Sequence, residues 1–357
     1  MPNLDDLHDP FLMKDMNLAV DRLIKAFQNN EKILIYGDYD VDGTTAVSLL
    51  YSFLKKRYNN ISFYIPNRYD EGYGISIKGI DYAAQHKFNL VIALDCGIKA
   101  IEKIDYANKK NIDFIICDHH LPGDTIPNAV AVLDPKRNDC SYPFKDLSGC
   151  GVGFKFLQAY CQKENIPLED LFQYLDLVAV SIASDIVPII GENRIIAHFG
   201  LIKLNENPII GLKALKDIAR VGQSKLNIND IVFKIGPRIN AAGRIENGTK
   251  AVELLTSETE AEARRHARDI NECNEDRKSL DQKIFQEALA MIESDIHYKD
   301  KKTTVLFNQN WHKGVIGIVA SRLIEYYYRP TIILTQSNGI INGSARTVDG
   351  FDLYNAI

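Results

Sequence analysis

The N-terminal part of the chain alternates short apolar runs with longer stretches in which apolar residues recur at helical spacing. After a lead-in helix within residues 1–31, the apolar run from Ile33 to Tyr36 predicts a buried strand. Further strands are predicted at 61–65, 90–94, 112–117 and 129–133, with helices at 44–57, 76–85, 99–109, 151–161 and 171–183. This alternation is typical of right-handed βαβ units, so we expect an α/β fold with a doubly wound parallel sheet.

A charged stretch follows, from Thr256 to Ser294, in which the apolar residues form one stripe of a helix. Its charges are of both signs, which favours a long, solvated connecting helix. Beyond it, residues 303–307 and 331–334 are predicted to be strands and residues 314–324 a helix. A smaller α/β region is therefore predicted near the end of the chain.

The composition is that of an ordinary globular protein, with 46% hydrophobic and 25% charged residues. At 357 residues the chain is too long for one typical domain, so we expect two. The net charge of −5 and the pI near 5.9 do not favour a nucleic-acid binder. Local basic patches can nevertheless exist within an acidic total, so charge alone excludes little.

The six cysteines show no CxxC pairing, which favours reduced, mostly buried thiols in a cytoplasmic protein. No apolar run approaches the roughly 18 residues that a membrane-spanning helix needs. The N-terminus, MPNLDDLHDP, lacks a basic region followed by an apolar core. We therefore expect neither export nor insertion into a membrane.

Three carboxylates follow the first predicted strand, at Asp38, Asp40 and Asp42. Alternate spacing in an extended segment would point all three to one side. Such crowding of like charges is unfavourable unless a cation or a shared proton relieves it. In an open parallel sheet, this carboxyl edge is also where ligands bind.

Other predicted strands end in the same kind of residue. Acid or imidazole groups follow three of them, at Asp95, at Asp118, His119 and His120, and at Asp134, while Asp185 follows an apolar helical run. Taken singly, each is most simply a capping or paired surface residue. Together they form an oxygen-rich set that suits Mn²⁺ or Mg²⁺. Two metals sharing a bridging carboxylate would serve in-line displacement at phosphorus.

Four motifs resemble, in content and order, those of the DHH phosphoesterase superfamily: DYDVDG (38–43), ALDCG (93–97), DHH (118–120) and ASDIVP (183–188). The third aspartate of the first motif and RYDEGYGIS (68–76) resemble the RecJ branch, the single-strand-specific 5′ to 3′ DNA exonucleases. The similarity continues through GPRINAAGRI (236–245), WHKGVIGIVASR (311–322) and GSARTVDGFDL (343–353). Leu34 stands where members acting on pyrophosphate or cyclic dinucleotides carry histidine, which favours the RecJ branch.

The resemblance implies two divalent cations, Mn²⁺ or Mg²⁺, and a catalytic pair beside them. The implied metal ligands are Asp38, Asp40, Asp95, His119 and Asp185, with Asp95 bridging. His120 would face the scissile phosphate. It would either stabilise the charge of the phosphate or assist the departure of the leaving oxygen. Asp118 would orient the imidazoles. Asp42 could be a ligand or could hold the turn, and the sequence leaves its role open.

Arginines in the later motifs are candidates for gripping the DNA backbone or its 5′ end, because a guanidinium pairs with phosphate through two parallel hydrogen bonds. The candidates are Arg244, Arg322 and Arg346 with Ser344, assisted by Asn240. Taken alone, an arginine is more often part of a surface salt bridge. Tyr73, between two glycines, is a candidate for stacking on a base.

The resemblance also implies a domain plan. A DHH phosphoesterase domain would span residues 1–205, a helical region with the long connecting helix 206–294, and part of a smaller α/β DHH-associated domain 295–357. The family pattern continues to a Gly-Gly-His motif and often to an OB-fold, whereas this chain stops at Ile357. We therefore expect a chain truncated at its C-terminus.

The expected function is a 5′ to 3′ exonuclease that releases mononucleotides from single-stranded DNA in repair and recombination. Expected partners are single-stranded DNA, a single-strand-binding protein and a helicase, and the chain is expected to be a cytoplasmic monomer. One alternative is a DHH phosphodiesterase for short oligonucleotides or dinucleotides, which the dependence of rate on substrate length would reveal. The other is a non-catalytic DNA-binding relative, against which the intact acids and His119 argue.

Overall fold

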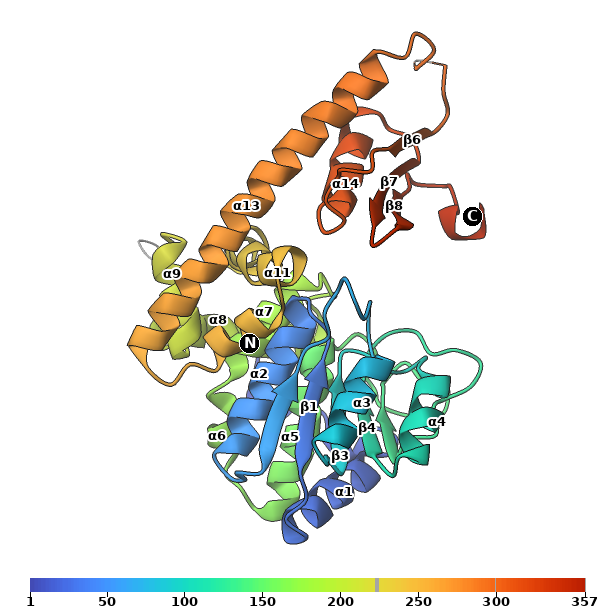
Figure 1. Cartoon of the computed structure of the whole chain (residues 1–357). Coiled ribbons are helices and arrows are strands. Elements are labelled where there is room, and N and C mark those ends of the chain that lie inside the picture. Colours follow the sequence, from blue (N-terminus) through green and yellow to red (C-terminus); the bar gives the residue numbers. More distant parts are fainter. Residues whose placement is uncertain (222–224, 299, 357) are drawn as a thin grey trace. The chain divides into compact units, whose positions relative to one another are not determined.

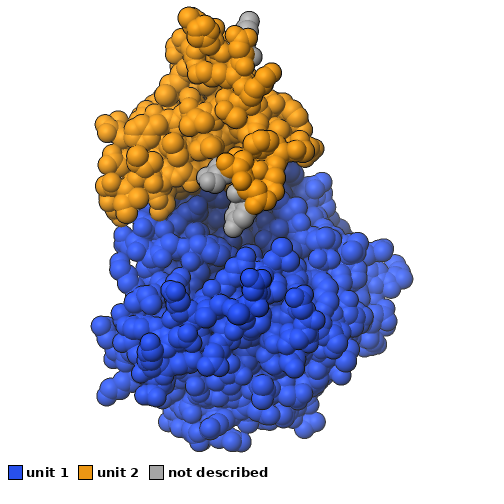
Figure 2. Space-filling model, turned by 90° about the vertical axis from the view of Figure 1, so that its right-hand side faces the viewer, with its two compact units in different colours: residues 1–271 blue, residues 272–357 orange. Residues whose placement is uncertain are grey.

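The computed structural model describes residues 1–221, 225–298 and 300–356 (Figure 1). The chain divides into two compact units, residues 1–271 and 272–357 (Figure 2). Unit 1 contains a parallel sheet with helices on both faces, and unit 2 is a smaller α/β unit with a sheet of its own. The predicted fold class, a parallel α/β domain with a long helix and a second, smaller α/β domain, is confirmed.

The sheet of unit 1 has five parallel strands in the order β2-β1-β3-β4-β5. They are β1 (Ile33–Gly37), β2 (Ile61–Tyr64), β3 (Leu90–Leu94), β4 (Asp113–Cys117) and β5 (Ala131–Leu133). β1 and β3 are buried along their whole length, as expected for strands covered on both faces. The register pairs Gly37 with Leu94 and Leu94 with Cys117. The residues that follow these three strands therefore emerge at one edge of the sheet.

Helices cover the two faces of this sheet (Figure 1), and the buried side chains form two separate cores. Helices α3 (Ile77–Gln85) and α4 (Ile101–Lys109) pack on one face. Helices α1 (Met16–Gln28), α2 (Val41–Lys55) and α5 (Gly149–Glu164) pack on the other. Alternate strand residues supply the two cores, since successive side chains of a strand point to opposite faces.

The remaining helices of unit 1 extend the core around α2 and α5. They are α6 (Leu168–Phe172), α7 (Leu175–Ser184), α8 (Gly191–Glu206), α9 (Ile210–Ile218), α10 (Ile228–Asp230), the π-helix η3 (Ile231–Ile235), α11 (Gly236–Ile245) and α12 (Thr249–Leu255). Two short 3₁₀ turns, η1 (Leu4–Asp6) and η2 (Pro10–Leu12), precede α1. The prediction of one helix at 171–183 is wrong, because the chain turns at Gln173 and Tyr174 and divides it into α6 and α7.

Helix α2 begins at Val41 rather than at the predicted Thr44. Asp40 caps it, since its side-chain Oδ1 accepts the backbone N–H of Gly43 at 3.0 Å. A Cβ atom at Gly43 would lie 2.5 Å from the backbone oxygen of Asp38. Gly43 therefore lies inside the helix, whose first turn packs directly on the end of β1. A residue with a side chain would not fit at this position.

Helix α13 (Glu260–Glu293) confirms the predicted long helix, and it spans the residues at which the two units meet in sequence. Unit 2 continues with β6 (Thr304–Phe307), α14 (Ile316–Tyr326), β7 (Thr331–Ser337), β8 (Ile340–Arg346) and α15 (Leu353–Ala356). β7 pairs in parallel with β6 and antiparallel with β8. Strand β8 was not predicted, although Asn338 and Gly339, both at positive φ, form the tight turn that joins it to β7.

A buried ion pair fastens the N-terminal segment to two helices of unit 1. Lys155 of α5 and Glu192 of α8 are 0% and 1% exposed, and their side chains meet at 2.9 Å. Lys155 also donates to the backbone oxygen of His8 at 2.6 Å, and Glu192 accepts the backbone N–H of His8 at 3.1 Å. The hydroxyl of Tyr142 donates to Glu192 at 2.6 Å. The two charges are therefore paired with each other and with further hydrogen-bonding groups.

The six cysteines are all buried and free, as expected for reduced thiols. Among the helices that the structure describes, none combines the length and apolarity needed to cross a bilayer.

Candidate metal centre

The first motif places its three carboxylates in three different backbone settings. Asp38 follows β1, Asp40 caps α2, and Asp42 lies in the first turn of that helix. The prediction of an extended segment with all three on one side is therefore wrong, because the chain becomes helical at Val41. Asp38 is fully buried and its Oδ1 accepts the N–H of Gly74 at 3.4 Å.

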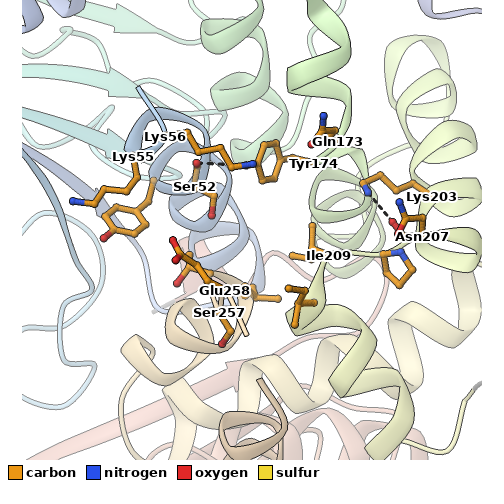
Figure 3. A pocket seen from close by; sticks show the side chains of 15 residues that line it. Ser52, Lys55, Lys56, Gln173, Tyr174, Lys203, Asn207, Ile209, Ser257 and Glu258 are labelled. Atoms are coloured by element: carbon orange, nitrogen blue, oxygen red, sulfur yellow. Dashed lines mark hydrogen bonds between the residues drawn. The ribbon is translucent and has the colours of Figure 1, made fainter. Parts of the chain in front are cut away.

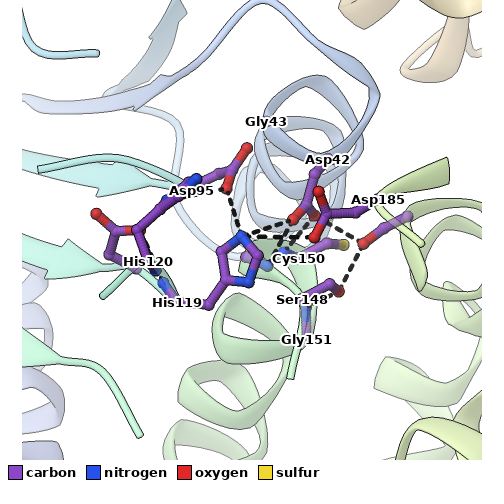
Figure 4. A network of polar contacts seen from close by, with 12 residues as sticks. Asp42, Gly43, Asp95, His119, His120, Ser148, Cys150, Gly151 and Asp185 are labelled. Atoms are coloured by element: carbon purple, nitrogen blue, oxygen red, sulfur yellow. Dashed lines mark hydrogen bonds and ion pairs between the residues drawn. The ribbon is translucent and has the colours of Figure 1, made fainter. Parts of the chain in front are cut away.

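Asp42, whose role the sequence left open, is held by hydrogen bonds from two other helices (Figure 4). Its Oδ2 accepts the N–H of Gly149 at 2.6 Å, and its Oδ1 accepts the N–H of Cys150 at 2.8 Å. The hydroxyl of Ser181, on α7, lies 2.7 Å from the same Oδ1 and 2.6 Å from the hydroxyl of Ser148. These contacts fix the carboxylate between α5 and α7.

His119 brings together carboxylates from three parts of the chain (Figure 4). Its Nε2 lies 3.2 Å from Oδ1 of Asp95, 3.6 Å from Oδ2 of Asp42 and 3.6 Å from Oδ2 of Asp185. Asp95 is in the left-handed region at φ 58°, directly after β3. A Cβ atom at Gly149 would lie 2.6 Å from the Cβ of Asp95, so α5 needs a glycine to approach this carboxylate.

Two overlapping sets of side chains could each hold a metal ion: Asp95, His119 and His120, and Asp42, His119 and Asp185. Burial raises the pKa of Asp40, and a side-chain hydrogen bond with Asp95 opposes this rise, so the two carboxylates are neighbours. Of the predicted ligands, Asp95, His119 and Asp185 are therefore brought together, with Asp40 beside them. Asp38 belongs to neither set, and its predicted ligand role is not tested by the structure.

The buried polar atoms of this cluster fit a divalent cation. Both ring nitrogens of His119, Oδ1 of Asp95 and Oδ2 of Asp38 have no hydrogen-bond partner among the described residues. Such atoms are costly to bury, and a bound ion would satisfy those that face it. Carboxylates with one imidazole match the oxygen preference of Mn²⁺ and Mg²⁺.

His120 is oriented by Asp118, whose Oδ1 lies 2.8 Å from Nδ1 of the imidazole. This bond raises the pKa of His120. Burial opposes ionisation of Asp118, but the bond from His120 and the backbone N–H of Ile98 outweigh it, so its pKa lies below the usual value. The hydroxyl of Tyr73 lies 3.2 Å from the other nitrogen, Nε2. Asp118 contacts the His119 backbone, not its ring, so it orients one imidazole of the predicted two.

The buried carboxylates of the cluster favour the binding of either protons or a cation. Burial, reinforced by neighbouring carboxylates, raises the pKa of Asp38 to about 8 and that of Asp185 to about 7, and raises the pKa of Asp95 well above its usual value. Burial lowers the pKa of His119, which keeps its imidazole neutral and available as a ligand.

The metal-free protein is therefore expected to lose stability as the pH rises from about 5 to about 8. In this range the native state holds protons on Asp38 and Asp185 that the unfolded chain has already released, so raising the pH favours unfolding. Thermal denaturation in EDTA across this range measures the effect. With Mn²⁺ present the decline should shrink, because the cation replaces the protons. A stability that stays level or rises in EDTA would contradict this account.

The predicted DNA contacts of unit 1 lie on α11, next to the first motif. A Cβ atom at Gly243 would lie 2.5 Å from the backbone oxygen of Tyr39, so this glycine lets α11 pack against the turn between Asp38 and Asp40. Arg244 follows it and accepts the Tyr69 hydroxyl through its backbone oxygen. The remaining candidate, Asn240, is half-buried on the same helix.

The predicted DNA contacts of unit 2 are partly engaged within that unit. Arg322 pairs with Asp281 at 3.0 Å and lies 3.9 Å from the ring centre of Phe285. The guanidinium of Arg346 contacts the hydroxyl of Ser344 at 3.3 Å and that of Ser321 at 3.2 Å. Arg346 and Ser344 thus lie together, while Arg322 also has a structural role.

Sequence reasoning missed several residues around the cluster. Arg68 lies over the ring of Tyr39, 5.0 Å from its centre, and lowers the pKa of Asp38 against the effect of burial. It lies within the quoted RYDEGYGIS motif, which could have identified it. Ser181, which contacts Asp42, and Ser148, which contacts the hydroxyl of Ser181, carry no comparable signal. Ser181 is an ordinary serine in a helical run, and Ser148 is the N-cap of α5.

Comparison with known proteins finds similarity to one family. The model of the DHH family, N-terminal domain, matches residues 32–182, and that of the DHHA1 domain matches residues 300–357. The single-stranded-DNA-specific exonuclease RecJ of Bacillus subtilis is 40% identical over 99% of this chain and 44% of its own length. RecJ of Escherichia coli is 35% identical over 95% of this chain and 61% of its own length. The chain thus spans about half the length of these curated relatives.

Solved structures agree with the sequence relatives. A crystal structure of exonuclease RecJ bound to manganese covers 99% of this chain and 86% of its own, with a TM-score of 0.86 at 28% identity. RecJ of Thermus thermophilus in complex with Mn²⁺ covers 96% of this chain and 49% of its own, with a TM-score of 0.83 at 28% identity. The chain is therefore similar to the DHH family over residues 32–182, to the DHHA1 domain over residues 300–357, and to the RecJ exonucleases in sequence and fold over nearly its whole length.

Proposed function

We propose that this chain carries the catalytic part of a metal-dependent exonuclease that removes mononucleotides from the 5′ end of single-stranded DNA. The observation that carries the proposal is the buried cluster around His119, whose unpartnered polar atoms suit a divalent cation. The similarity to manganese-bound RecJ over nearly the whole chain supports it.

The proposed cofactors are two divalent cations, Mn²⁺ or Mg²⁺. Their proposed ligands are Asp40, Asp42, Asp95, His119 and Asp185, with Asp95 between the two ions. Asp42 joins the predicted set because its carboxylate faces His119. Asp38 stays an alternative ligand. When bound, such ions lower the pKa of a water molecule and neutralise charge on the phosphate.

His120 is proposed to act on the leaving oxygen. Asp118 holds one nitrogen of its ring and keeps the other, Nε2, on the side of Tyr73. Because this contact raises the pKa of His120, the imidazole can carry the proton that a departing alkoxide needs. Asp118 is thus a positioning residue.

The DNA contacts are proposed to be sequence-independent, since arginine and serine groups directed at phosphate carry no base information. In unit 1 these are Arg68, Arg244 and Asn240. In unit 2 they are Ser344 and Arg346, with Arg322 contributing from its pair with Asp281. We also propose a monomeric, cytoplasmic role in DNA repair and recombination, with a single-strand-binding protein and a helicase as partners.

The test is product analysis on a long 5′-labelled single strand with Mn²⁺, alongside the matching duplex and a dinucleotide. Labelled mononucleotide is expected from the single strand only. EDTA should abolish its release and added Mn²⁺ should restore it, because the proposed reaction needs a bound cation to activate water and to neutralise charge on the phosphate.

Each rival function predicts a different result. Cleavage of the dinucleotide alone would favour a phosphodiesterase for short substrates. Binding of the strand without cleavage, together with no uptake of Mn²⁺ by calorimetry, would favour a non-catalytic DNA-binding protein and overturn the proposal.

A further inference from the structure

A hollow of about 750 Å³ lies in unit 1 at the C-terminal end of α2 (Figure 3). Its lining comes from the end of α2, the turn between α6 and α7, the junction of α8 and α9, and the residues that follow α12. Lys55, the last residue of α2, lies about 20 Å along the helix from Asp42 of the metal centre. The hollow is therefore separate from the candidate metal site.

The lining of this hollow is positively charged in a chain whose net charge is −5. Lys55, Lys56 and Lys203 belong to it, and Glu258 is the one acidic residue among the described lining residues. Asp176, a fully buried neighbour of Lys203, lies outside the lining and leaves a net positive charge when it is counted. The lining therefore favours an anion with more than one negative charge.

The three lysines keep hydrogen-bond donors for such an anion. Lys203 donates to the backbone oxygen of Asn207 at 2.7 Å, and Lys55 to that of Asn59 at 2.9 Å. An ammonium group has three N–H donors, so each of these two lysines retains donors for a ligand. Lys56 is exposed and forms no hydrogen bond or ion pair with a described residue. Lysine is a common partner of phosphate, which can accept several of these bonds.

The rest of the lining suits a planar, partly apolar group. Tyr51 is half-buried, and its ring packs edge-on against that of Phe63 with 5.2 Å between the ring centres. Ile209, Ile210 and Leu255 add apolar surface to the same lining. An aromatic ring held in this way can stack on a base, and the apolar side chains stabilise the base by burial.

We propose that this hollow binds a nucleoside diphosphate or triphosphate, with its phosphates on Lys56 and Lys203 and its base beside Tyr51. The volume lies within the range of small-molecule sites, about 300–1,000 Å³. Inorganic polyphosphate would leave the aromatic and apolar lining unused, and an uncharged nucleoside would leave the lysines unused. Binding in this hollow goes beyond the proposed exonuclease activity and does not depend on strand cleavage.

The test is calorimetric titration of ATP into the intact chain with Mg²⁺. The double substitution Lys56→Gln and Lys203→Gln should raise the Kd at least about tenfold, because two attractive charges are removed. The matched control is Lys25→Gln with Lys109→Gln. These lysines are exposed on α1 and α4 and lie outside the lining, so the same change in net charge should leave the Kd unaltered.

Two further titrations separate the two halves of the ligand. Adenosine and inorganic tripolyphosphate should each bind at least about tenfold more weakly than ATP, since each lacks one half. Tyr51→Leu should weaken ATP binding several-fold and leave tripolyphosphate binding unchanged. Tripolyphosphate that binds as tightly as ATP, or a lysine double variant that binds ATP as the unmodified chain does, would overturn the proposal.

The Asp95→Asn chain distinguishes this hollow from the metal centre. It should bind ATP as tightly as the unmodified chain, because the hollow lies at the other end of α2. Loss of ATP binding in this variant would assign the ligand to the metal centre, and displacement of ATP by an oligothymidylate would assign the hollow to DNA. Either result would overturn the proposal. Strand cleavage tests the exonuclease separately, so each proposal can fail without the other.

Discussion

Replacing Asp95 with asparagine is expected to reduce strand cleavage by at least about 1,000-fold while the fold stays intact. The carboxylate lies 3.2 Å from His119 and is the proposed bridge between two cations, so an amide would remove charge from both metal sites. A loss of this size corresponds to about 4 kcal/mol of transition-state stabilisation. Asparagine is preferred to alanine because it tolerates the left-handed backbone at φ 58°. Initial rates on a single strand with Mn²⁺ measure the effect.

The control for this substitution is Asp105→Asn, an exposed change on α4 that should leave the rate unaltered. In EDTA at about pH 8, the Asp95→Asn protein should be at least as resistant to unfolding as the original, since burial and neighbouring carboxylates hold the pKa of Asp95 well above its usual value. Cleavage within tenfold of the unmodified chain would show that Asp95 does not bridge the metals.

Lys155→Met is expected to cost about 3–5 kcal/mol of unfolding free energy, because it leaves the buried carboxylate of Glu192 without its counter-charge. It also removes the bond to the backbone oxygen of His8, which ties the N-terminal segment to α5. Urea denaturation followed by circular dichroism measures the loss. The double variant Lys155→Met with Glu192→Leu should recover part of it, since no unpaired charge remains while the Tyr142 hydroxyl and the His8 backbone lose their partners.

The matched control is Lys213→Met, which breaks an ion pair with Glu260 whose partners are 53% and 52% exposed. An exposed pair contributes about 0.2–1 kcal/mol, so this change should be small. Equal losses in the Lys155 and Lys213 variants would mean that burial of the first pair has no special consequence.

The sheet of unit 1 could be predicted because its strands are buried on both faces. Such strands read as short, continuous apolar runs, and the predicted strand at 90–94 coincides with β3. The acidic residues that follow these apolar runs then indicate the edge of the sheet at which the candidate site lies. Strand β8 was missed because its sequence, IINGSAR, is half exposed and lacks an apolar run. The Asn-Gly pair before it is a known hairpin signal that could have revealed it.

The candidate site was predicted less completely than the fold. The spacing of the three aspartates is the same whether residues 38–42 are extended or helix α2 starts at Val41. Asp40, three residues before Gly43, is compatible with an N-cap, but this alone does not decide between the two. The hydrogen bonds that aim Asp42 at His119 come from helices far along the chain. No local pattern encodes such contacts, so the position of Asp42 required the tertiary structure, and the ligand roles stay predictions.

The carboxylate of Asp42 reaches its partners only after distant stretches of chain have come together. Its hydrogen bonds to Gly149 and Ser181 span 107 and 139 residues. Contacts that close such long loops form slowly, so the metal centre is expected to be among the last parts to assemble as the chain folds. Uptake of Mn²⁺ would then report the completion of folding, and a chain still being synthesised would lack a complete metal site until α7 has docked.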